Sequence, residues 1–184
     1  MKRILNYFLR LLKRFRKQSV INFPEIDSTK TLNLPSEISD VEKITRFVFS
    51  PINVNPNTGK LKSNCYKPPS GYDEVSVNRL DFTSANFLKS IALKMQNTNR
   101  NYFGFGIINA LDIRNSDSDI IYTPTTESTD YNPYHSDIKI GYTVITGEEL
   151  PAEISNKIQK LVKLTRLYKD NNPELNNWTG DELL

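Results

Sequence analysis

The residues best suited to chemistry are a histidine and an aspartate two positions apart. His135 is the only histidine in the chain, and Asp137 follows it closely. If a strand begins at residue 136, alternation places both side chains on one face. An imidazole beside a carboxylate forms an acid/base pair or part of a phosphate site. The alternative is that His135 only caps the strand or binds main-chain groups.

Two arginines are candidates for binding an anion. Arg79 is in phase with Val75 and Val77, so it points inward if that strand continues. An inward arginine needs a carboxylate or an anionic ligand, because an unpaired buried charge is costly. Asp137 would serve as a structural partner, which the sequence favours, and a phosphate as a functional one. Arg46, on an adjacent strand, could join the same cluster.

Other chemistries find little support in the sequence. Cys65 is the only cysteine, so an intrachain disulfide, a thiolate zinc cluster and CxxC redox chemistry are excluded. With a single histidine as well, we predict no metal site. Residues 103–106 contain two glycines but lack the third glycine and following helix of a dinucleotide fingerprint. Those glycines favour close strand packing instead, and we predict no cofactor.

Three segments of the chain together resemble a pattern found in small uncharacterised bacterial proteins. They are residues 61–66, residues 73–79 (with Glu-x-Ser-Val-x-Arg) and residues 132–138 (Asn-Pro-x-His-x-Asp-Ile). The resemblance covers residues 45–142 and leaves both terminal helices outside it. The resemblance implies no particular activity. It implies only that Arg79 and His135 belong to one site.

The elements that would position these residues form an α+β domain. We predict a mostly antiparallel sheet of about five strands covered by two helices, plus a separate N-terminal amphipathic helix. Helices are predicted from Thr83 or Ser84 to residue 96 and over 151–169. The predicted strands span residues 43–50, 74–80, 102–111, 119–123 and 136–146, with a short return strand at 60–66.

The chain divides into four parts by composition. Residues 1–18 form a basic amphipathic helix, and residues 19–40 a proline-punctuated linker. Residues 41–170 form the α+β domain, and residues 171–184 a loose tail. A polar loop over 124–134 is long enough to suggest a site beside His135.

Charge is segregated along the chain. Seven of the 24 basic residues lie in the first eighteen positions, which hold no acidic residue. The remainder therefore holds 17 basic and 21 acidic residues, a net charge of −4. On a helix, the apolar side chains fall within an arc of roughly 160° and the basic ones opposite. The residues expected to make contacts are Lys2, Arg3, Leu5, Phe8, Arg10, Leu12, Lys13, Arg14, Phe15 and Lys17.

Such a helix has three interpretations. It lies on an anionic membrane surface, docks in a groove of a partner protein, or packs on its own domain. Its apolar run is too short to span a bilayer, and the features of a secretory signal are missing. The acidic body argues against a nucleic-acid partner. We therefore predict a cytoplasmic protein. In the first interpretation it also attaches peripherally to the membrane.

Two hypotheses of function follow from these patterns. The leading one is a non-catalytic accessory or adaptor protein held at a membrane surface or partner by residues 1–18. The alternative is a small enzyme or ligand-binding domain for a phosphate-bearing or nucleotide substrate. In that case Arg79 and Arg46 bind the anion, His135 moves a proton and Asp137 orients the imidazole.

Overall fold

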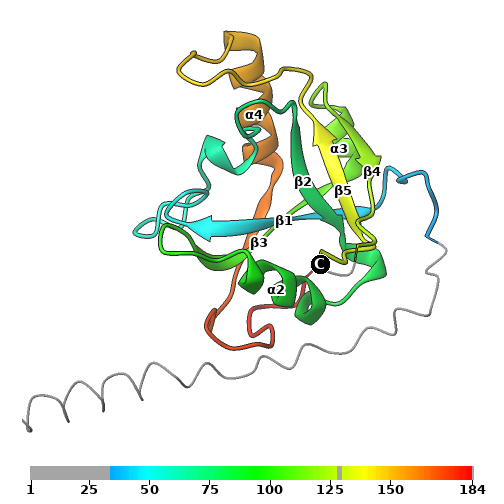
Figure 1. The fold of residues 1–184 in the computed structure, drawn as a ribbon, viewed down its shortest axis with the longest axis vertical. Helices are drawn as coiled ribbons and strands as arrows, with labels where there is room; N and C mark the ends of the chain where they lie inside the picture. Colours follow the sequence, from blue (N-terminus) through cyan, green and yellow to red (C-terminus); the bar gives the residue numbers. More distant parts are fainter. Residues whose placement is uncertain (1–33, 128–129, 184) are drawn as a thin grey trace, which may run out of the picture.

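A computed structural model describes residues 34–127 and 130–183. The predicted N-terminal helix and most of the predicted linker lie outside these residues. The described part contains one six-stranded sheet, three α-helices and two short 3₁₀ helices (Figure 1). The elements are β1 (Lys43–Ser50), η1 (Ser63–Cys65), β2 (Glu74–Arg79), η2 (Leu80–Phe82), α2 (Ala85–Lys94), β3 (Asn101–Asn109), α3 (Ala110–Arg114), β4 (Asp119–Tyr122), β5 (His135–Lys139), α4 (Ala152–Leu164) and β6 (Arg166–Lys169).

All neighbouring strands of the sheet are antiparallel, in the order β4-β5-β2-β1-β3-β6. The predicted α+β class and antiparallel sheet are therefore confirmed. The sheet has six strands where about five were predicted, and the described residues form three helices where the domain was expected to have two.

The two faces of the sheet carry separate cores because side chains alternate along each strand. On one face, Ile44 and Val48 of β1 belong to a cluster with Ile158 and Leu161 of α4. On the other face, the β1 residue Phe47 belongs to a cluster with Leu88 and Ala92 of α2. Helices α4 and α2 therefore cover opposite faces (Figure 1).

Several predicted strands end or fold differently from the prediction. The predicted strand at 60–66 is reduced to a single bridge between Val54 and Leu61, followed by η1. The predicted strand over 102–111 ends at Asn109, because Ala110 begins the short helix α3. The strand predicted over 136–146 ends at Lys139.

The predicted helix over 151–169 divides into a helix and a strand. α4 ends at Leu164, and residues 166–169 form β6, which pairs with β3 at the edge of the sheet. Gly104 makes this pairing fit, since a Cβ there would lie 2.1 Å from the Tyr168 carbonyl oxygen. The close strand packing predicted for the 103–106 glycines is thus confirmed.

The segment after β6, predicted as a loose tail, contacts the α2 face of the sheet. The Trp178 ring packs on Phe105 with ring centroids 4.9 Å apart. Asp170 forms an ion pair with Lys89 of α2 at 2.6 Å, and both side chains are completely buried. Lys89 Nζ also donates to the carbonyls of Asn172 and Asn177.

Candidate functional site

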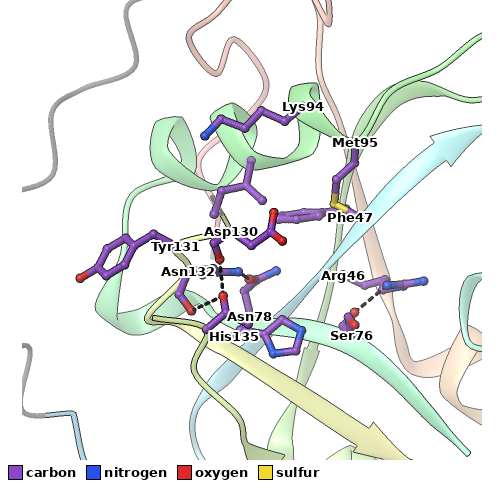
Figure 2. Close-up of a pocket in the computed structure, with 12 residues that line it drawn as sticks. Arg46, Phe47, Ser76, Asn78, Lys94, Met95, Asp130, Tyr131, Asn132 and His135 are labelled. Atoms are coloured by element: carbon purple, nitrogen blue, oxygen red, sulfur yellow. Dashed lines mark hydrogen bonds between the residues drawn. The ribbon is translucent and has the colours of Figure 1, made fainter. Parts of the chain in front are cut away.

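A pocket lies on the α2 face, between the helix, strands β1 and β2, and the loop leading into β5 (Figure 2). Its volume is about 380 Å³, which is within the range of small-molecule sites. The lining residues are Arg46, Phe47, Ser76, Asn78, Ile91, Lys94, Met95, Thr125, Asp130, Tyr131, Asn132 and His135.

The pocket exists because β1 and β2 separate soon after they pair. Only two residue pairs join them, Ile44 with Arg79 and Thr45 with Asn78. By contrast, β1 pairs with β3 over its whole length. Beyond these pairs the two strands do not pair with each other, and Arg46 and Phe47 of β1 and Ser76 of β2 form part of the pocket wall.

The Arg46 side chain bridges the gap between the separating strands. Its Nη1 donates to the Ser76 carbonyl on β2 at 2.6 Å, and its Nε donates to the Cys65 carbonyl at 3.0 Å. No carboxylate lies within ion-pair distance of this guanidinium in the described part of the chain. Main-chain oxygens thus fix the position of the Arg46 guanidinium. Among these described residues, its positive charge has no carboxylate counterion beside the pocket.

His135 and Asp137 lie side by side on one face of β5, as the strand alternation predicts. Nε2 of His135 is 3.8 Å from Oδ1 of Asp137. Thr123, just after β4, contacts both: its hydroxyl donates to Asp137 Oδ2 at 2.6 Å and lies 3.0 Å from His135 Nδ1. Sequence reasoning missed Thr123, which only the β4–β5 register brings beside this pair.

The main chain fixes which imidazole nitrogen carries the proton. Nδ1 of His135 lies 2.8 Å from the carbonyl oxygen of Thr123, which can only accept a hydrogen bond. The Thr123 hydroxyl hydrogen is already used by Asp137. Nδ1 therefore donates, and in the neutral ring Nε2 is left as an acceptor and a base. This is the group with which the site could accept a proton.

Two asparagines form the floor between His135 and Phe47. Asn78 of β2 lies directly opposite His135 of β5 in the strand register. Its Oδ1 accepts a 2.7 Å hydrogen bond from Nδ2 of Asn132. Both asparagines are buried, and neither was predicted from the sequence as a site residue. In Figure 2, Arg46 lies to one side of the pocket and Asn132 to the other, with Asn78 and His135 between them.

Helix α2 supplies the apolar wall. Ser84, one of the two residues predicted as the cap, closes its N-terminus by accepting from the Phe87 amide at 3.2 Å. Leu88 is buried in the core, which leaves the neighbouring Ile91 and the C-cap residue Met95 to line the pocket opposite Phe47. A flat apolar group of a ligand can therefore lie between the helix and the sheet.

Arg79 does not line this pocket, although it was predicted to share a site with His135. Its side chain is fully buried on the other face of β2. Its partner is Glu42 rather than Asp137, with Nε and Nη2 each 2.8 Å from a carboxylate oxygen. The guanidinium also stacks between the rings of Phe82 and Tyr122. Arg79 is thus occupied by protein groups.

Arg79 also binds the segment that leads into the domain. Its Nη1 donates to the Pro35 carbonyl at 2.5 Å, and its Nη2 donates to the Glu37 carbonyl at 3.3 Å. Residues 35–42 are thereby attached to the end of β2. Of the four predicted site residues in the domain, the structure places Arg46 and His135 at the pocket, with Asp137 directly behind His135.

The described residues contain no group of three or more histidine, cysteine, aspartate or glutamate side chains arranged to hold a metal ion. None of the helices within residues 34–127 and 130–183 has the length and apolar character needed to cross a membrane.

Comparison with known proteins gives no further guide to this site. No protein-family model matches the chain, no curated protein matches its sequence and no solved structure matches its fold. The functional argument therefore depends on the geometry of the pocket.

Proposed function

We propose that the domain binds a small phosphate-bearing ligand in the pocket beside α2. The observation that carries this proposal is the state of Arg46. Its guanidinium donates to the two carbonyls already described and interacts with the Cys65 thiol, and it has no carboxylate partner among the described residues. A cation fixed in this way beside a cavity is suited to bind phosphate oxygens with its remaining N–H groups.

The charges around the cavity are consistent with an anionic ligand. Two of the charged lining residues, Arg46 and Lys94, are basic, and Asp130 is acidic. His135 adds an acceptor nitrogen in its neutral form and a further positive charge when protonated. In an enzyme, the same Nε2 would accept a proton from the bound substrate while Asp137 stabilises the imidazolium.

A titration of the full chain tests this proposal. Chemical shifts of the ¹⁵N-labelled protein would be followed as ribose 5-phosphate or inorganic phosphate is added. We expect saturable shifts at residues lining the pocket. R46Q should weaken binding roughly 10- to 100-fold, because hydrogen bonds to charged groups contribute about 1.5–3 kcal/mol. R166Q is the control, since Arg166 lies on the distant edge strand β6 and stacks on Tyr168.

Two outcomes would contradict the proposal. One is the absence of pocket shifts at millimolar phosphate ester. The other is equal affinity in wild type and R46Q, provided that circular dichroism shows R46Q to be folded.

A second proposal concerns residues 1–18, and the charge segregation of the sequence supports it. In this proposal the protein is a non-catalytic accessory or adaptor protein held at an anionic membrane surface by its N-terminal segment. Seven basic residues without an acidic one would bind anionic headgroups, and Leu5, Phe8, Leu12 and Phe15 would enter the acyl boundary. A pocket in the domain is compatible with this attachment.

Flotation with liposomes tests the second proposal. The full chain should float with vesicles that contain anionic lipid and not with neutral ones, while a chain beginning at Ser19 should remain unbound. The double variant K13E/R14E keeps the length of the segment and should bind weakly. If the full chain fails to float with anionic vesicles, the lipid proposal is wrong, and the segment becomes a candidate for docking on a partner protein.

A further inference from the structure

The oxygen and nitrogen of the Asn78 side-chain amide can be told apart by their hydrogen bonds, starting from a main-chain amide. The Tyr134 amide donates to Oδ1 of Asn132 at 3.3 Å, which identifies that atom as oxygen. Nδ2 of Asn132 then donates to Asn78, so the accepting atom of Asn78 is its oxygen. The remaining Asn78 atom is therefore the amide nitrogen, a donor of two hydrogens.

This nitrogen has no hydrogen-bond partner among the described residues. The Asn78 residue is only 2% exposed, and what is exposed belongs to the pocket wall. The nitrogen is not one of the fully buried polar atoms that lack a partner, and the small exposed area of Asn78 faces the pocket. A ligand with a hydrogen-bond acceptor would satisfy it.

The neighbouring strand supplies a candidate acceptor for the same ligand. His135 is the cross-strand neighbour of Asn78, and such pairs have Cβ atoms about 4.5–5.5 Å apart. The Thr123 carbonyl holds the proton on Nδ1, so neutral His135 offers Nε2 as an acceptor. The pocket thus presents one donor and one acceptor next to each other, on the same face of the sheet.

We propose that Asn78 and His135 together bind a planar lactam or amidine edge, and that the ligand is a nucleotide. Such an edge carries an acceptor and a donor on two atoms bonded to the same carbon, and these would complement Asn78 Nδ2 and His135 Nε2. The faces of the heterocycle lie against Phe47, Ile91 and Met95. The inference rests on the proposed binding of phosphate at Arg46, which holds the other end of the ligand.

The fixed hydrogen bond between Asn132 and Asn78 limits this recognition. Because Oδ1 of Asn78 is engaged, the residue cannot contact a base through both amide atoms. Discrimination between lactam and amidine bases is therefore weak at this pair. The pocket should bind uridine and adenosine monophosphates with similar affinity, and both more tightly than the sugar phosphate.

Isothermal titration of the full chain with ribose 5-phosphate, uridine monophosphate and adenosine monophosphate tests the inference. The ratio of the sugar-phosphate Kd to the nucleotide Kd should be at least about tenfold, as expected when buried polar groups gain partners. In N78D this ratio should fall to near one. The carboxylate of N78D still accepts from Asn132, and its charge affects all three phosphates alike. N101D, at the exposed start of β3, is the control and should keep the wild-type ratio.

The outcomes separate this inference from the function on which it rests. If ribose 5-phosphate binds and the nucleotides bind no more tightly, the nucleotide inference is wrong while phosphate binding stands. If none of the three binds, both are wrong. A wild-type ratio in N78D would overturn the role of Asn78. Should N78D fail to fold, H135F removes the acceptor while keeping an aromatic ring, and it should also lower the ratio.

Discussion

Arg79 and Glu42 form a two-point ion pair inside the domain, with both nitrogen–oxygen distances at 2.8 Å. The arginine side chain is fully buried and that of the glutamate is 8% exposed. Removing one partner of such a pair leaves a charge in a medium that solvates it poorly.

We therefore expect R79M and E42Q each to lower the free energy of unfolding by about 3–5 kcal/mol, as measured by urea denaturation. R114Q is the matched control, because Arg114 pairs with Asp40 at the surface and should contribute about 0–1 kcal/mol. A loss of ligand binding in R79M without a loss of stability would contradict the structural role of Arg79.

The tautomer of His135 is directly observable, since the chain has one histidine. Long-range ¹H–¹⁵N correlation at a pH where the ring is neutral should show the proton on Nδ1, because the Thr123 carbonyl accepts from it. A proton on Nε2 would contradict the acceptor role that the pocket assigns to this nitrogen.

The buried ion pair of Lys89 and Asp170 should stabilise the packing of the C-terminal segment on the domain. D170N leaves the lysine charge without its counterion, so we expect a loss of about 3–5 kcal/mol. Trp178 is the only tryptophan, and its fluorescence reports contact with Phe105. In D170N its emission should shift to the red at lower urea than in wild type. Conservative D181N, at an exposed position of the same segment, should leave the transition unchanged.

Stability should fall at alkaline pH because of Cys65. Burial raises the pKa of its thiol from 9.0 to about 11, against an opposing effect of Arg46. Above pH 9 the unfolded chain loses this proton while the folded chain keeps it, so the free energy of unfolding decreases as pH rises to 11. The contribution is about 2–3 kcal/mol. Burial also raises the pKa of Tyr66, which adds to the effect.

The measurement compares the pH dependence of urea unfolding in wild type and C65A. The variant should be less stable near neutral pH because of the lost side chain, but its stability should decline less between pH 9 and 11. An identical decline in both proteins would show that the Cys65 thiol does not contribute.

The sequence predicts well those elements whose pattern is local. The strands β1 and β2 alternate clearly, and Ser84 is a recognisable cap for α2. The strand β6 was missed because Tyr168 continues the apolar stripe of α4. What decides its conformation is the space beside Gly104, more than sixty positions earlier in the chain.

The site was predictable only in part for the same reason. Alternation places His135 and Asp137 together, since it depends on a single strand. The partner of Arg79 depends on the β1–β2 register, which brings the arginine opposite Ile44 and near Glu42. Nothing in the sequence assigned a role to Asn78, Asn132 or Thr123, and three separate segments must fold before they meet.

The strand order also bears on how the sheet assembles during synthesis. Among the described residues the first strand to be made is β1, which takes a central place and forms only two residue pairs with β2, the next strand. Its eight pairs with β3 become available only after residue 109 has been translated. Until then the apolar side chains of β1 have few native neighbours. The nascent chain therefore carries an incomplete hydrophobic strand while residues 51–109 are made, and such exposed apolar strands are prone to aggregate during folding.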